Sequence, residues 1–425
     1  LYRYFNYGGP INVQRALICL NAVLNWSGEM LAPPEPVPLD GLYHPDLGYV
    51  SDVAAYVRDR IDPNRPTVGL WTFQTYWLNG NLAHIDALIR EIEAQGANVL
   101  PVFSMRLKDA ALGNRGSDEI IQTYFMDGGR PRIDVLINVM SMSMTLTHAD
   151  YRRLFPELDV AVLQAMTSTN PYAVWKESVQ GMSVMDVTFQ AAQPEFDGNL
   201  IALPVATREE DTIDPITGAL LARLVPIPDR VTAMVRLALN WAKLRRKPNA
   251  DKRIAIVFHH YPPRNDRIGC AFGLDSFAGV KHLLDAMAGE GYRLDRPYAD
   301  GDELANEMLQ RMTCDRRWLT PDQMAERAEA SASREMFIPW HEALPDTVKR
   351  KMTENWGEMP GSLFVHEDTL YFAGLMNGNV FLTIQPPRGY LENPEAILHD
   401  LHLSPPHHYL AHYRWIRNVF QADAV

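Results

Sequence analysis

The chain has 425 residues, of which 47% are hydrophobic and 22% are charged, and its formal net charge is -12. These proportions are those of a globular protein with a sizeable core, and they exclude global disorder. The acidic balance argues against a nucleic-acid partner. We expect no membrane span, because the chain contains no run of about 20 apolar residues.

Cysteine usage indicates the compartment. Cys19, Cys270 and Cys314 are far apart and form no Cys-x-x-Cys pair, which is typical of a reducing environment. The first ten residues are too polar for a signal peptide. The sequence therefore predicts a cytoplasmic protein, and its length allows two or three domains at roughly 100–200 residues each.

The first part of the chain predicts an α/β domain. Residues 1–62 are expected to form an N-terminal segment with a Pro-rich extended loop at 33–46. Residues 63–250 then alternate between apolar runs and helical patterns, including a helix at 82–96 that ends at Gly96. A parallel sheet covered on both faces is expected, with strands at 67–71, 98–103, 133–139 and 160–166.

The second part, 251–425, predicts another α/β domain. A strand and loop are expected at 252–264, and an amphipathic helix at 277–292. Asn377-Gly378 stands between apolar runs and predicts a β-hairpin near the C-terminal end. We expect a helical insertion at about 300–355, exposed over 302–336. The ending "FQADAV" is typical of an opening strand, so we expect the domain to be cut before its natural end.

The fold class predicted is therefore α/β, with two or more parallel-sheet units. Several nucleotide and hydrolase motifs are missing from the sequence: G-x-G-x-x-G after a strand, G-x-x-x-x-G-K-[ST], H-E-x-x-H and G-x-S-x-G. Their absence disfavours a dinucleotide enzyme, a P-loop NTPase and an α/β-hydrolase. If the chemistry needs ATP, this chain is not expected to hydrolyse it.

The stretch "LHDLHLSPPHHYLAHYRW" (398–415) carries five of the 13 histidines. Ser404 is expected to cap a helix, with Pro405 and Pro406 in its first turn. The helix should run from about His407 towards Phe420. The face expected to pack inward comprises Tyr409, Tyr413, Ile416 and Phe420.

The same stretch predicts neutral imidazoles. The helix dipole disfavours a charged ring at His407, and a neutral ring can accept a proton or bind a borderline metal. His408 and His412 lie one turn apart. His399 and His402 flank Asp400, which could orient one of them. A structural cap is the alternative, and a metal hydrolase would need a further ligand beside the helical pair.

Four segments carry a family resemblance: "GLYHPD" (41–46), "YPPRNDRIGCAFGLDSFAG" (261–279), "VFLTIQPPRGY" (380–390) and "HDLHLSPPHHYLAHYRWIRNVFQADAV" (399–425). In this order they resemble the large, CobN-type subunit of aerobic cobaltochelatase and the H subunit of magnesium chelatase. The resemblance extends over nearly the whole chain. In that family the chain is much longer.

The resemblance implies the tetrapyrrole-binding catalytic subunit of an ATP-dependent metal chelatase. Such a ligase inserts Co²⁺ into hydrogenobyrinic acid a,c-diamide in cobalamin biosynthesis, and separate AAA+ partner subunits hydrolyse the ATP. One alternative is the magnesium relative, which inserts Mg²⁺ into protoporphyrin IX. Another is a tetrapyrrole-binding protein without catalysis.

Metal insertion requires a base, because two ring N–H protons leave as the metal enters. The catalytic candidates are His407, His408 and His399. The candidates for holding the metal are His408, His412 and His402. Imidazole suits Co²⁺, whereas Mg²⁺ prefers oxygen ligands, so the sequence favours cobalt.

Arginine can hold the carboxylates at the edge of the macrocycle. Arg388, Arg264 and Arg267 are the candidates, each on a loop after an apolar run, where open α/β sheets bind ligands. His44 and Tyr261, in the first two matching segments, are further substrate-binding candidates. A solvated loop charge remains the alternative for Arg264, and a turn stabilised by Asp46 the alternative for His44.

Overall fold

The computed structural model describes residues 1–27, 32–146, 154–215, 218–389, 400 and 402–425. Contacts divide the chain into two compact units, unit 1 (Leu1–Arg246) and unit 2 (Lys247–Val425). Within the described ranges, no helix combines the length and the apolar character needed to cross a bilayer.

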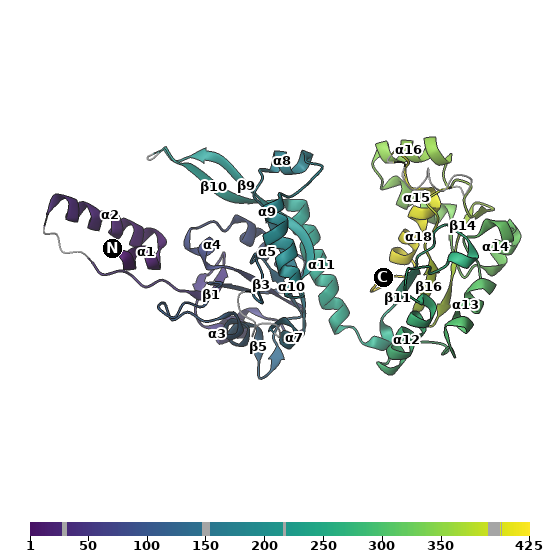
Figure 1. Cartoon of the computed structure of the whole chain (residues 1–425), viewed down its shortest axis with the longest axis horizontal. Coiled ribbons are helices and arrows are strands. Elements are labelled where there is room, and N and C mark those ends of the chain that lie inside the picture. Colours follow the sequence, from purple (N-terminus) through teal and green to yellow (C-terminus); the bar gives the residue numbers. More distant parts are fainter. Residues whose placement is uncertain (28–31, 147–153, 216–217, 390–399, 401) are drawn as a thin grey trace. The chain divides into compact units, whose positions relative to one another are not determined.

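The regular elements of unit 1 are helices and strands in alternation (Figure 1). The helices are α1 (Tyr2–Tyr7), α2 (Gly9–Asn25), α3 (Val53–Arg60), α4 (Gln74–Leu78), α5 (Ala83–Ala94), α6 (Ser117–Ile120), α7 (Leu154–Leu158), α8 (Tyr172–Glu177), α9 (Val184–Val187), α10 (Gln193–Phe196) and α11 (Pro228–Arg246). The strands are β1 (Asp40–His44), β2 (Gly48–Val50), β3 (Thr67–Phe73), β4 (Asn98–Ser104), β5 (Met126–Asp127), β6 (Arg130–Pro131), β7 (Val135–Asn138), β8 (Ala161–Ser168), β9 (Leu200–Ile213) and β10 (Leu220–Pro226).

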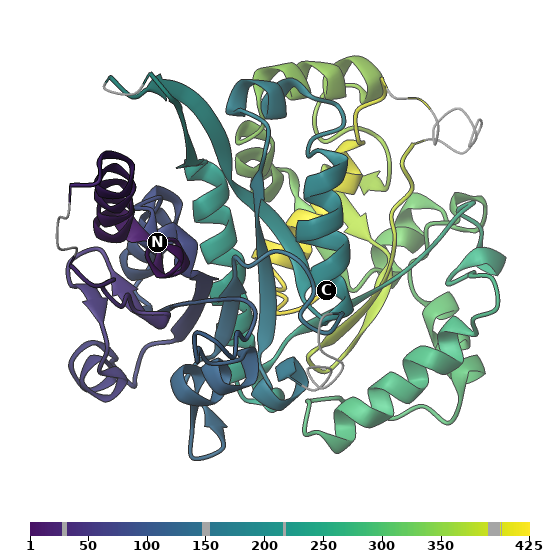
Figure 2. The same cartoon turned by 60° about the vertical axis from the view of Figure 1, so that its left-hand side comes forward.

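An 8-stranded sheet in the order β10-β9-β8-β7-β3-β4-β1-β2 organises unit 1. The run from β9 to β4 is parallel, and antiparallel strands flank it on both sides. The β9–β10 hairpin projects from the rest of the unit (Figure 2). The predicted strands are confirmed as β3, β4, β7 and β8, and the predicted helix as α5. The α/β fold class is confirmed.

The pleat divides the core of unit 1 between the two faces of the sheet. Val68 and Leu70 of β3 belong to a core shared with α5 and α11, which lie side by side. Trp71 of the same strand belongs to a separate core that includes Tyr56 of α3 and Phe155 of α7. Both faces are therefore covered, as the continuous apolar runs predict.

Unit 2 contains helices α12 (Ser276–Gly289), α13 (Gly301–Gln310), α14 (Pro321–Arg327), α15 (Arg334–Glu342), α16 (Asp346–Trp356) and α18 (His407–Asn418). Its strands are β11 (Ile254–Phe258), β12 (Ala330–Ser333), β13 (Val365–His366), β14 (Thr369–Phe372), β15 (Gly374–Asn377) and β16 (Val380–Ile384). They form two three-stranded sheets, in the orders β11-β16-β15 and β12-β14-β13.

The sheet β11-β16-β15 combines a parallel pair with the predicted hairpin. β11 runs parallel to β16, while β15 and β16 are antiparallel and joined at Gly378–Asn379. Leu382 of β16 packs into a core with Leu284 of α12 and Met308 of α13. Phe381 of β16 packs into another core with Phe337 of α15 and Trp415 of α18. The histidine-bearing helix α18 is thereby anchored to unit 2.

The stretch 302–336 is more buried than its sequence suggests. We expected it to be helical and exposed, but Leu304 and Met308 are completely buried and Ala330–Ser333 forms strand β12. The expectation of exposure is wrong because these apolar side chains complete the cores of unit 2. Near the end of the sequence, Ala424 forms an isolated parallel bridge with Ile254 of β11.

The hairpin turn gives the first prediction. Gly378 has φ 64°, and a Cβ there would lie 2.5 Å from the carbonyl oxygen of Arg293. Gly378→Ala therefore combines a disfavoured backbone with a backbone clash, and should destabilise unit 2 by roughly 2 kcal/mol or more. Gly273→Ala is the control, because Gly273 has φ 74° with nothing near its Cβ position; it should cost about 1 kcal/mol. Hydrogen exchange of the β15 and β16 amides measures the stability of both variants. Equal losses of stability in Gly378→Ala and Gly273→Ala would contradict the clash.

Candidate active site

Helix α18 turns its histidines inward. His407, His408 and His412 are each about 1% exposed, and they share the buried face with Ala411 and Trp415. We expected Tyr409, Tyr413, Ile416 and Phe420 to pack inward. Ile416 and Phe420 are buried as expected, but Tyr409 and Tyr413 are only half-buried. The expectation is wrong for the two tyrosines because carbonyl and aromatic partners inside unit 2 accommodate the imidazoles.

The start of α18 also differs from expectation. Pro406 is the capping residue and no side chain caps the helix. The Ser404 hydroxyl instead bonds to the side-chain oxygen of Asn355, and the Ser404 carbonyl accepts a hydrogen bond from the Trp356 indole. Ser404 therefore joins the start of α18 to the end of α16. His407 becomes the first residue of the helix.

His407 is held in one protonation form. Its Nε2 lies 3.0 Å from the carbonyl oxygen of Gly357. Because a carbonyl only accepts, Nε2 of a neutral ring must carry the proton, and Nδ1 then has a lone pair. Nδ1 is buried without a hydrogen-bond partner among the described residues. Burial lowers the pKa of His407, and the Gly357 carbonyl opposes that shift.

His408 follows the same pattern. Its Nε2 lies 2.7 Å from the carbonyl oxygen of Tyr371 on β14, and its buried Nδ1 has no partner within the described ranges. Its ring centre lies 4.7 Å from that of Phe364 and 5.5 Å from that of Phe372. Burial lowers the pKa of His408 to about 4, so the ring is neutral at pH 7.

His412 lies one turn further along, against Phe372 and the Thr383 hydroxyl, whose oxygen is 3.4 Å from Nε2. Burial, and then the proximity of His408, lower the pKa of His412 to about 3. A cavity of about 10 Å³, lined in part by His407, His408, Trp356 and Gly361, adjoins the first two rings. It has room for about one water molecule.

Arg388 lies near the outer face of α18. It is exposed in the loop after β16. Burial raises the pKa of Tyr413, its neighbour Tyr409 raises it further, and the Arg388 guanidinium lowers it. Arg388 is therefore within electrostatic range of Tyr413. The Tyr409 and Tyr413 rings have centres 5.1 Å apart, so two aromatic side chains and one cation gather on this face.

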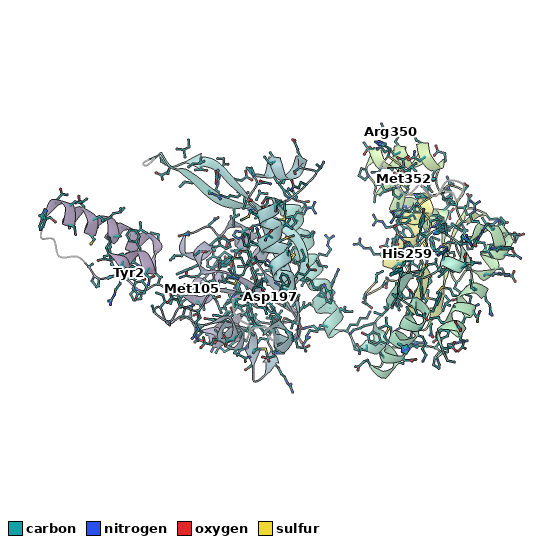
Figure 3. The ribbon with its side chains drawn as sticks, viewed as in Figure 1. Tyr2, Met105, Asp197, His259, Arg350 and Met352 are labelled. Carbon is teal, nitrogen blue, oxygen red and sulfur yellow. The ribbon has the colours of Figure 1, made fainter. Side chains whose placement is uncertain are left out.

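The loops after β11 and β16 leave the sheet at one edge. Phe258 pairs with Ile384 at the carboxyl ends of the two parallel strands, and the Gln385 amide donates to the Phe258 carbonyl. His259 is exposed at this edge (Figure 3), and Tyr261 in the same loop is half-buried. The candidate arginines therefore lie on loops that follow strands, as the apolar runs before them indicated.

The other predicted arginines have local partners. Arg264 forms a two-point ion pair with Asp266, at 2.9 and 2.8 Å. Arg267 is exposed, with one guanidinium nitrogen 3.7 Å from the Cys270 sulfur. Of the three arginines proposed for substrate binding, Arg388 is the one whose charge acts on Tyr413 of α18.

His44 belongs to unit 1 and is completely buried. Its Nε2 lies 3.1 Å from the Glu93 carboxylate and 3.2 Å from the Arg60 guanidinium. Its Nδ1 accepts from the Asp46 amide, as the turn alternative predicted. The ring therefore has a structural partner at both nitrogens.

The remaining candidates are less informative. His399 lies outside the described residues. His402 is exposed, and its backbone amide donates to the Asp400 carboxylate. Across the described part of the chain, no three His, Cys, Asp or Glu side chains gather so as to hold a metal ion. The metal set His408, His412 and His402 therefore stays a prediction.

Sequence reasoning missed His341 of α15. It is 8% exposed, and its ring centre lies 5.4 Å from that of His407. The signal was available in the spacing, because Phe337 and His341 are four residues apart and share one helical face.

Known proteins resemble this chain throughout its length. A family model described as CobN/Magnesium Chelatase matches residues 2–425. An uncharacterized protein of Methanocaldococcus jannaschii is 36% identical, over 100% of this chain and 35% of its own length. The aerobic cobaltochelatase subunit CobN of a Sinorhizobium species is 32% identical, over 100% of this chain and 33% of its own.

A solved structure has a similar fold. The catalytic subunit of cobaltochelatase from Mycobacterium tuberculosis superposes with a TM-score of 0.70 at 29% identity, covering 100% of this chain and 34% of that chain. The chain thus spans about a third of the length of the curated relatives it matches.

Burial of the imidazoles predicts how stability depends on pH. The unfolded rings have a pKa of about 6.5, so between about pH 6.5 and pH 4 the unfolded chain binds more protons than the folded chain. Stability should therefore fall as the pH falls through that window. The shift of His408 to about 4 corresponds to a loss on the order of 3 kcal/mol.

Hydrogen exchange of the α18 amides measures this dependence. His412→Leu removes one of the two histidines whose pKa is strongly lowered, and it should reduce the pH dependence of stability by about half. His282→Leu, on the exposed side of α12, should leave it unchanged. A free energy of opening that does not vary between pH 6.5 and pH 4 would contradict the neutral, buried state.

Proposed function

The chain belongs to the CobN/magnesium chelatase family, and from this membership we propose that it forms part of the tetrapyrrole-binding catalytic subunit of a metal chelatase. The reaction proposed is insertion of Co²⁺ into hydrogenobyrinic acid a,c-diamide in cobalamin biosynthesis. Separate AAA+ subunits would hydrolyse the ATP, which agrees with the lack of a P-loop motif in this sequence.

The two faces of α18 carry the proposal. The outer face offers Tyr409, Tyr413 and the cation of Arg388 at the edge where two parallel strands end. Flat aromatic surfaces suit a planar macrocycle, and a guanidinium suits its peripheral carboxylates. The inner face offers neutral imidazoles with free lone pairs. Substrate recognition and proton acceptance are thereby combined on one helix.

His407 and His408 are the proposed bases. Each uses Nε2–H on a backbone carbonyl and keeps a lone pair on Nδ1. Both rings are too buried to touch a macrocycle directly. The small cavity beside them could hold a water molecule that relays the proton. His399 remains a third candidate.

The choice of cobalt rests on the donor chemistry. Neutral imidazole nitrogen binds Co²⁺ well, whereas Mg²⁺ prefers oxygen and retains its water. The buried face of α18 is rich in nitrogen donors, among them His408 and His412 of the proposed metal set. Insertion of Mg²⁺ into protoporphyrin IX is the alternative within the same family.

Arg388 gives a direct test of the substrate surface. Arg388→Ala should weaken binding of hydrogenobyrinic acid a,c-diamide to the chain by roughly tenfold, or about 1.4 kcal/mol, because a charge-assisted bond to a carboxylate is lost. Arg264→Ala is the matched control and should have little effect, since that side chain already pairs with Asp266. Absorbance titration measures both, and equal losses would refute the assignment to Arg388.

The reaction itself is tested with the complete gene product that carries this chain. Supplied with AAA+ partners, ATP and Co²⁺, it should convert hydrogenobyrinic acid a,c-diamide to the cobalt complex, and His408→Gln should slow that conversion. Preference for protoporphyrin IX and Mg²⁺ would assign the magnesium reaction instead. Tight ring binding without metal insertion would identify a carrier, and no ring binding would overturn the proposal.

A further inference from the structure

A pair of buried imidazoles joins His341, which has no role above, to His407, one of the proposed bases. His341 projects from α15 and His407 from the first turn of α18, and their ring centres are 5.4 Å apart with the ring planes at 45°. His341 is 8% exposed and His407 1%. Two elements distant in sequence therefore bring two imidazoles together in the interior of unit 2.

The hydrogen-bonding capacity of this pair is largely unused. Neither ring nitrogen of His341 has a hydrogen-bond partner within the described ranges, and Nδ1 of His407 has none either. Buried polar atoms are nearly always hydrogen-bonded, so three nitrogens without a hydrogen bond on adjacent rings call for an explanation. The nearest charge to one of them is the Glu342 carboxylate, 3.9 Å from His341 Nδ1. Ordinary packing against Phe337 accounts for the ring contacts. It does not account for the nitrogens.

The geometry of the pair matches that of two ligands on one metal ion. An imidazole nitrogen lies about 2.1 Å from such an ion, which places each ring centre roughly 3 Å from it. Two such rings at a tetrahedral angle have centres roughly 5 Å apart. The observed separation of the two ring centres, 5.4 Å, is close to this value.

The groups around the two rings also favour a metal site. The Gly357 carbonyl takes the Nε2 proton of His407, which fixes the tautomer in which Nδ1 is free; histidine ligands are commonly oriented in this way. Gly361 lets its loop approach the ring, since a Cβ there would lie 3.0 Å from His407 Cδ2. The Glu358 carboxylate acts on both rings and the Glu342 carboxylate acts on His341, and these negative charges favour a cation. The Lys349 ammonium also acts on His341 and opposes one.

We propose that His341 and His407 together bind a divalent first-row transition-metal ion. No third His, Cys, Asp or Glu side chain completes a cluster in the described part of the chain. Two imidazoles would therefore hold the ion, and water would have to supply the other positions; the cavity of about 10 Å³ beside His407 has room for about one such molecule. That the bound ion is the Co²⁺ destined for the macrocycle rests on the proposed function; His408 then remains as the base.

The test is a Co²⁺ titration of the 425-residue chain without tetrapyrrole, followed by calorimetry and by the visible absorption of the ion. The wild type should bind one Co²⁺ at this site. His341→Ala and His407→Ala should each weaken that binding by at least about tenfold. His282→Ala, which removes an exposed histidine of the same unit, should leave it unchanged. Binding that neither His341 nor His407 affects would overturn the proposal.

A second measurement does not depend on the variants folding. X-ray absorption of the wild-type chain loaded with one equivalent of Co²⁺ should show two imidazole nitrogens bound to the ion. A spectrum without imidazole scattering would refute the site. Failure of the chain to bind Co²⁺ while it still binds the tetrapyrrole would reject the metal site alone. Loss of tetrapyrrole binding with Co²⁺ binding intact would reject the proposed function and leave the site standing.

Discussion

Burial of the imidazoles of α18 is the constraint on which the chemistry of unit 2 depends. A ring removed from water loses its proton, because the charged form is poorly solvated there, and the pKa values of His408 and His412 fall to about 4 and about 3. The carbonyl groups of Gly357, directly after α16, and of Tyr371 on β14 then determine that Nε2 of each ring carries the hydrogen. Charge state and tautomer are thus determined by the fold before any ligand arrives.

This constraint also separates two tasks on one helix. The tyrosines and Arg388 remain accessible on the outer side, where a large planar ligand has room. The imidazoles lie on the inner side, where only water or a small ion fits. The sheet β11-β16-β15 supports both sides of the helix. Phe381 of β16 packs against α18, and the loop that follows β16 carries Arg388.

Much of the fold was predictable from local patterns. The apolar runs of β3, β4, β7 and β8 and the Asn377-Gly378 turn specify their own conformations, since burial on both faces and positive φ leave few alternatives. The inward face of α18 was not predictable, because hydrophobicity ranks tyrosine above histidine and the compensating carbonyls of Gly357 and Tyr371 are distant in sequence. His341 escaped notice for the same reason: its partner is 66 residues away along the chain. His44, although it lies within a matching segment, is part of a polar network in unit 1.

The carbonyl contacts of His407 and His408 have a kinetic consequence. Each Nε2–H is enclosed and hydrogen-bonded, so it can exchange with bulk water only when this part of the structure opens. The exchange of these protons for deuterium therefore reports on the opening of the interior. After transfer to heavy water, their lifetimes record how often α18 separates from β14 and from the end of α16, and hence how often the interior is open to solvent.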